Sequence, residues 1–167
     1  MKLKTYILIY GIIFLLQPLV ASFLPNRMSI DPLLCITIAI SITFREEHLI
    51  KPIVVVAFFT ICKDLVFNQF IGVSLISLIS VVFFVFFVRR IINTENLLTD
   101  ALVCASSILI YNSIYWLIYS FLGTTYSYLY MLKRLPLSLA IEVIITEIML
   151  YFLINKLVQA RRDGYFR

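Results

Sequence analysis

Six long runs of apolar residues, divided by short polar breaks, make up nearly the whole chain. They cover residues 5–24, 28–44, 52–67, 70–88 (or 72–88), 97–122 and 135–157. A hydrocarbon core of ~30 Å calls for about 20 apolar residues per helix. The pattern therefore predicts an all-α polytopic membrane protein: a bundle of six transmembrane helices in a single domain, residues 1–167. The second and third runs are short, so we expect their helices either to tilt little or to be partly sheltered by neighbours.

The breaks between runs are small, which predicts tight loops. Pro25 and Asn26 separate the first two runs, and Asn68 and Gln69 separate the third from the fourth, with Gly72 close by to let the backbone turn. The first run is longer than the apolar region of ~7 to 15 residues in a signal peptide. We therefore expect an uncleaved first span.

The composition agrees with a membrane protein, since 62% of the residues are hydrophobic and 14% are charged, with a mean hydropathy of +1.03. The net charge of +5 does not indicate nucleic-acid binding, because the basic residues stand in short loops between apolar runs. The three cysteines lie inside apolar runs, where a thiol acts as a small hydrophobe. Neither a disulfide nor a metal or other cofactor is expected.

The basic residues predict an orientation, because loops rich in Lys and Arg stay in the cytoplasm. With the N-terminus inside, ten of them fall on the cytoplasmic face, three fall outside and Lys63 lies within a span. The ten are Lys2, Lys4, Arg45, Lys51, Arg89, Arg90, Lys156, Arg161, Arg162 and Arg167, and the three are Arg27, Lys133 and Arg134. We expect both termini in the cytoplasm (N-in/C-in), with the basic tail also suited to anionic lipid headgroups.

Polar residues at membrane depth are the candidates for function, because a charge at a helix centre costs about 2.5 to 3.5 kcal/mol. Asp31 precedes Pro32, which suits a helix N-cap. At about 1.5 Å per residue, Asp64, Asn112 and Glu142 also reach the outer half of their helices. These four residues are expected to converge near the external face. They serve either to join helices by hydrogen bonds or to form a site for a ligand, a lipid or a partner helix.

Other residues near these positions have simpler interpretations. Lys63 is expected to point outward toward the interface while its neighbour Asp64 points into the bundle. Tyr111, Tyr115 and Tyr119 lie four residues apart and are expected to form an aromatic belt at the membrane surface, with a surface that faces a partner as the alternative. The chain has no GxSxG, HExxH, Walker or dinucleotide-binding motif, so we expect it not to be an enzyme.

Two stretches resemble the MreD family, the bacterial rod shape-determining membrane proteins. Residues 29–34, with Asp31, resemble the start of the family's second helix. Residues 56–90 resemble its best-marked region: an apolar helix ending in an acidic residue (here Asp64), a short turn with Gly72, another apolar helix and the basic pair Arg89 and Arg90. The resemblance implies a multi-pass protein of the bacterial cell membrane without catalytic activity. Its implied partners are an MreC-like membrane protein, a RodA-type synthase and the penicillin-binding partner of that synthase.

Two other classes stay open. The substrate-binding S component of an energy-coupling-factor vitamin transporter is also a small six-helix protein with an outward-facing site. Such subunits carry a pair of alanines four residues apart on the first helix, where this chain has only Ala21. A proton-coupled carrier using Glu142 and Glu147 fits less well, because the chain has no internal repeat for alternating access.

Overall fold

The computed structural model describes residues 3–23, 30–44, 46–68, 70–91, 97–123 and 127–165. Those residues form helices and short turns, with no strand among them, so the all-α prediction is confirmed. The helices are α1 (Leu3–Phe23), α2 (Pro32–Thr43), α3 (Glu46–Phe67), α4 (Val73–Ile91), α5 (Leu97–Phe121) and α6 (Tyr128–Tyr165).

The predicted and observed helix bounds agree best where the polar breaks themselves end a helix. α5 begins at Leu97 as expected, and α3 ends at Phe67 as expected. α3 begins six residues before the predicted Pro52, and α6 extends beyond its apolar run in both directions. Glu, Lys and Arg are good helix formers, so a helix continues after its apolar run has stopped. The predicted ends at residues 24 and 28 lie outside the described residues.

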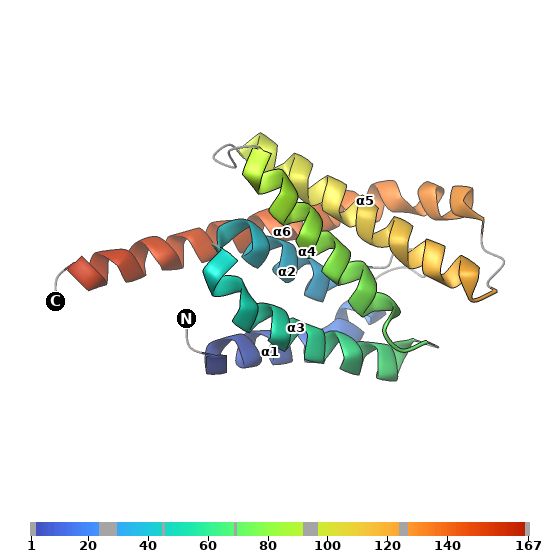
Figure 1. Cartoon of the computed structure of the whole chain (residues 1–167), viewed down its shortest axis with the longest axis horizontal. Coiled ribbons are helices and arrows are strands. Elements are labelled where there is room, and N and C mark those ends of the chain that lie inside the picture. The colour runs from blue at the N-terminus through green and yellow to red at the C-terminus, as the bar shows by residue number, and fades with distance from the viewer. Residues whose placement is uncertain are drawn as a thin grey trace.

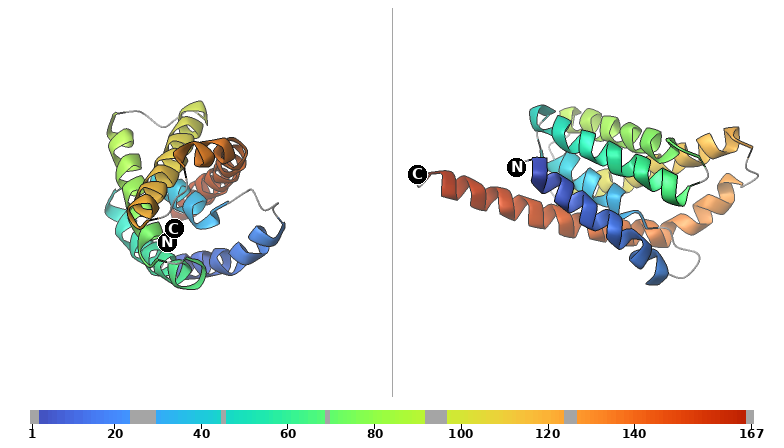
Figure 2. Two further views of the ribbon diagram at one scale, coloured as in Figure 1. Left: turned by 90° about the vertical axis from the view of Figure 1, so that its right-hand side faces the viewer. Right: turned by 90° about the horizontal axis from the view of Figure 1, so that it is seen from below.

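The shortest helix, α2, lies at the centre of the molecule. It contacts each of the other five helices, and every side chain from Pro32 to Ile42 is buried. Seen end-on, α2 is surrounded by the other helices (Figure 2, left). It has 12 residues and no polar face, as its sequence of Leu, Ile, Ala, Thr and Ser requires. The expectation that the second helix is sheltered by its neighbours is therefore confirmed.

Successive helices run in opposite directions along the bundle (Figure 1). α1, α3 and α5 end at one end of the bundle, where α2, α4 and α6 begin. The start of α1 and the end of α6 lie toward the opposite end, and the last turns of α6 project beyond the other helices (Figures 1 and 2). The end at which α2, α4 and α6 begin is called the cavity end below.

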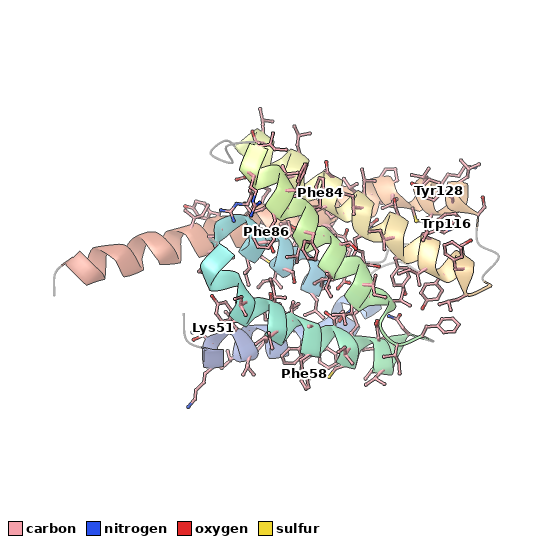
Figure 3. The ribbon with its side chains drawn as sticks, in the orientation of Figure 1. Lys51, Phe58, Phe84, Phe86, Trp116 and Tyr128 are labelled. Atoms are coloured by element: carbon pink, nitrogen blue, oxygen red, sulfur yellow. The ribbon has the colours of Figure 1, made fainter. Side chains whose placement is uncertain are left out.

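Large apolar side chains point outward on α3 and α4, while small side chains pack inside. On α4 the buried residues are Val73, Ser74, Ser77, Leu78, Val81, Val82 and Val85. Phe83 and Phe87 on the opposite side are 68% and 66% exposed. Phe58 of α3 also points away from the bundle (Figure 3). Small residues between helices and large apolar ones outside are typical of bundles surrounded by lipid.

Three of the described helical segments are long and apolar enough to cross a membrane: Val73–Ile91, Leu98–Phe121 and Leu135–Ile154. Two further apolar helical segments, Lys4–Leu19 and Pro32–Thr43, are shorter. At about 1.5 Å per residue, α2 covers roughly 18 Å, well under a hydrocarbon core of about 30 Å. By length and composition the chain therefore has the character of a membrane protein.

Candidate functional site

Asp31 is the first of the predicted residues whose contacts define the site. It stands at the N-cap of α2 with Pro32 in the first helical turn, as expected, but its side chain makes no capping hydrogen bond. Instead Asp31 Oδ2 forms an ion pair with Lys63 Nζ of α3 and accepts a hydrogen bond from Tyr111 Oη of α5, 3.1 Å away. Its backbone N–H donates to Glu142 Oε1 of α6 at 2.9 Å. Four helices therefore meet at this residue.

Lys63 corrects one prediction, because it does not point outward to the interface. It is only 9% exposed, pairs with Asp31, and its Nζ lies 5.9 Å from the centre of the Tyr111 ring. An outward lysine would leave the Asp31 carboxylate buried without a compensating charge, which costs several kcal/mol. The pairing across 32 positions of sequence could not be seen in the local pattern.

Glu142 is almost fully buried, with 2% of its surface exposed. Its carboxylate lies at the N-terminal end of α2, where the helix dipole favours negative charge. The next acid on this helix, Glu147, does not line the same cavity as Glu142. The two acids therefore belong to different places, because residues five apart on a helix face different directions.

Asp64 is completely buried, but it serves the turn between α3 and α4. Its Oδ2 accepts the backbone N–H groups of Gly72 at 2.8 Å and Ser74 at 3.1 Å, and its Oδ1 accepts Asn68 Nδ2 at 2.6 Å. Gly72 has a φ of +93°, a left-handed conformation that costs other residues about 1–2 kcal/mol. Asp64 therefore anchors the start of α4, where the first N–H groups of a helix lack partners.

A cavity of about 350 Å³ opens at the cavity end of the bundle. Asp31, Asn112 and Glu142 line it, as the sequence predicted, whereas Asp64 and Gly72 do not. Asn68 connects the two regions, because its Oδ1 accepts Tyr115 Oη at 3.2 Å while its Nδ2 reaches Asp64. The polar lining residues are Gln17, Asp31, Lys63, Asn68, Tyr111, Asn112, Tyr115 and Glu142.

Tyr111 and Tyr115 were expected in an aromatic belt, but both line this cavity. Their rings stack on each other with centroids 6.1 Å apart, and the Tyr115 and Tyr119 rings stack at 4.8 Å. The spacing of four residues is the same for a belt and for a stripe facing inward, so the sequence did not distinguish them. Trp116 and Tyr128, which contact each other at a centroid distance of 4.9 Å, lie on the outside near this end (Figure 3).

The chemistry of the site is that of binding groups: charges, amides and phenols. Among the described residues no group of three or more His, Cys, Asp or Glu side chains is placed to hold a metal ion. Comparisons with known proteins identify no relative, because no protein-family model, no curated protein and no solved structure matches the chain. Any function must therefore be argued from the residues themselves.

Proposed function

We propose that the chain crosses the bilayer six times with both termini in the cytoplasm. Three helical segments have the length and apolarity for a full crossing, and ten of the 14 basic residues fall on the inner face in this arrangement. The alternating helix directions support it (Figure 1). In this arrangement α2 crosses only part of the hydrocarbon core. The cavity lies at the end of α2, in the part of the core that this short helix does not reach. The cavity faces the outside.

We propose further that this bundle is a non-enzymatic scaffold of the MreD kind in the bacterial cell membrane. It would bind an MreC-like membrane protein and organise a RodA-type synthase with its penicillin-binding partner. The observation that carries the proposal is the contact of Asp64 with Gly72. These two residues match the best-marked region of the family, and here they form one unit that fixes α4 against α3.

The partner's membrane helix would pack against the outer faces of α3 and α4. Exposed apolar side chains follow a helical spacing on both: Val54, Phe58, Ile61 and Leu65 on α3, and Ile76, Ile79, Phe83 and Phe87 on α4. The Asp64 carboxylate accepts hydrogen bonds from this chain's own Gly72 and Ser74. Its role would therefore be to hold the outer faces of α3 and α4 in a fixed position relative to each other. The partner would contact the faces and not the acid.

Copurification in detergent with a coexpressed MreC-like protein tests the scaffold role. We expect a stable complex, and we expect intramembrane cross-linking to the partner from Phe58→Cys or Phe83→Cys but not from Ile144→Cys on α6, which is similarly exposed. Each test uses the chain with Cys35, Cys62 and Cys104 replaced by Ala or Ser, since these three are free thiols. A monomer despite coexpression would overturn the proposal.

The cavity favours a second candidate, the substrate-binding S component of a vitamin transporter. Its volume of about 350 Å³ lies at the lower end of the ~300–1,000 Å³ typical of small-molecule sites. Uptake of a vitamin that fails with Glu142→Gln and persists with Glu147→Gln would favour this candidate over the scaffold. Glu142 is the better probe than Asp64, because Asp64 does not line the cavity.

A further inference from the structure

Around the cavity, five hydrogen-bond donor groups are occupied, whereas two buried acceptor atoms are free. Lys63 Nζ and Tyr111 Oη both donate to Asp31. Asn68 Nδ2 donates to Asp64 and to Ser74, at 2.6 and 3.0 Å. Tyr115 Oη donates to Asn68, and Asn112 Nδ2 donates to the Ile108 carbonyl at 2.9 Å. Each of these five donor groups is thus already engaged within the protein.

Two acceptor atoms on lining residues have no such partner. Asp31 Oδ1 and Gln17 Oε1 are buried, and no described residue donates a hydrogen bond to either of them. A buried acceptor without a donor costs about 1–3 kcal/mol. These two acceptors therefore lack hydrogen-bond donors, and a ligand that supplies donors would remove this cost.

The formal charges point the same way. The cavity is lined by two carboxylates, Asp31 and Glu142, and by one basic residue, Lys63. Lys63 is already paired with Asp31, so a ligand carboxylate or phosphate would find no uncommitted cation among the described lining residues. Two acids and one lysine leave a formal charge of −1, which a monovalent cation would balance.

We propose that this cavity binds a small organic ammonium group, because five donor groups of its lining are committed to the protein while the acceptors Asp31 Oδ1 and Gln17 Oε1 are not. The ammonium N–H groups would reach toward Asp31, Glu142 and Gln17, with the Tyr111 and Tyr115 rings alongside. Aromatic rings favour a nearby cation. The group could belong to a water-soluble amine or to an ethanolamine lipid headgroup, since both present the same chemistry.

This inference stands apart from the scaffold role, which copurification tests separately. The probes are three molecules of nearly equal size: ethanolamine, neutral ethylene glycol and anionic glycolate. We expect saturable binding of ethanolamine to the purified full chain in detergent, seen by titration calorimetry and as a rise in melting temperature. Choline, a cation without N–H donors, should bind more weakly than ethanolamine. No binding of ethanolamine, or equal binding of all three, would overturn the proposal.

Variants locate the binding. Glu142→Gln should weaken ethanolamine binding about tenfold, the loss expected when a charge-assisted hydrogen bond becomes a neutral one. Gln17→Leu should weaken ethanolamine binding about threefold. This variant removes no charge from the core, so it keeps the proposal testable if Glu142→Gln unfolds. Glu147→Gln is the matched control and should bind as the unchanged protein does. An equal loss in Glu147→Gln and Glu142→Gln would contradict a site in this cavity.

Lipid nanodiscs distinguish the two sources of the ammonium group. If the natural ligand is a headgroup, phosphatidylethanolamine added to phosphatidylglycerol discs should raise the melting temperature and compete with ethanolamine, and Glu142→Gln should remove both effects. If the ligand is a soluble amine, ethanolamine should bind equally in discs with and without that lipid. Both results support an ammonium site. The ammonium site would be contradicted if ethanolamine does not bind and phosphatidylethanolamine still stabilises both Glu142→Gln and Gln17→Leu.

Discussion

At its N-terminal end α2 meets the carboxylates of Asp31 and Glu142, whereas at its C-terminal end it meets the guanidinium group of Arg89. Arg89 Nη1 of α4 donates to the Ser41 and Phe44 carbonyls at 2.7 and 2.6 Å. Both arrangements match the helix dipole, which favours anions at the start and cations at the end. At the C-terminal end Arg89 matches the partial negative charges of these two carbonyls.

The N-terminal end holds more than the helix dipole requires. Lys63 offsets the Asp31 carboxylate, and the helix dipole, which is worth only about half a charge, leaves part of the Glu142 charge unmatched. A cavity adjoins this end. The charge at the C-terminal end of α2 therefore serves stability, while the charges at the N-terminal end exceed what the helix dipole requires.

The largest expected effect comes from breaking the N-terminal arrangement with Lys63→Met. This change leaves two buried carboxylates without a cation, and removal of one partner of a buried ion pair costs about 3–5 kcal/mol. The measurement is thermal unfolding in detergent with a thiol-reactive dye in a Cys62→Ala background, since the remaining Cys35 and Cys104 are buried and should react only on unfolding.

Lys133→Met is the control for Lys63→Met, because Lys133 is exposed, and it should change the melting temperature little. The double variant Asp31→Asn with Lys63→Met should recover part of the loss, because one uncompensated carboxylate is then removed. Equal melting temperatures for Lys63→Met and Lys133→Met would show that the pair with Asp31 does not stabilise the fold.

Asp64→Ala should have the next largest effect, about 3 kcal/mol, and should act through α4 instead of α2. It leaves the N–H groups of Gly72 and Ser74 without an acceptor in a buried position. Amide hydrogen exchange should rise mainly at the first turn of α4. Asn68→Ala removes one donor to Asp64 and keeps both backbone contacts, so its effect should be clearly smaller. Exchange that rises first in α2 would contradict this separation.

Arg89→Ala breaks the C-terminal end of α2 and should destabilise the protein by about 2 kcal/mol, the upper range for a cation at a helix end. Arg90→Ala changes an exposed residue and should have a smaller effect on the melting temperature. Combined with Lys63→Met, Arg89→Ala should be nearly additive, because the two ends of α2 lie roughly 18 Å apart. A coupling as large as the Arg89→Ala effect itself would mean that the ends are not independent.

Gly72→Ala should give the smallest effect, about 1 kcal/mol. No atom lies within 4 Å of an added Cβ, so the strain comes only from the φ of +93°. Gly11→Ala is the contrasting control: an added Cβ would lie 3.6 Å from the Phe59 ring, an ordinary contact, and α1 would gain about 1 kcal/mol of helix propensity. Melting temperatures should therefore shift in opposite directions. A stabilising Gly72→Ala would contradict the role of this turn.

The helices were predictable because apolar runs and polar breaks are local properties of the sequence. The same holds for Asp31 at the N-cap before Pro32, and for Asp31, Asn112 and Glu142 reaching one cavity, since helix rise alone gives their depth. The rotation of a side chain about its helix was less predictable. Lys63 and Asp64 are neighbours in sequence, and which of them faces α2 depends on partners that lie 32 and 8 residues away.

Gln17 was missed because an amide within an apolar run gives no signal by itself, and Asn68 was missed because its place in the break between two runs indicated only a turn. Their roles depend on which unpaired atoms remain once the helices have packed. A search for amides at the same estimated depth as Asp31 and Glu142 would have found Asn68, which directly follows the end of α3.

The length of α2 also has a consequence for biosynthesis. A segment of 12 apolar residues is too short to be accepted as a full membrane span by itself, and it leaves the ribosome before α3 to α6 exist. Asp31 gains its counter-charge only when Lys63 has been made, and Glu142 reaches the start of α2 only after α5 is complete. Nascent chains that have not yet made α6 therefore keep one side of α2 uncovered, because α6 packs directly on it.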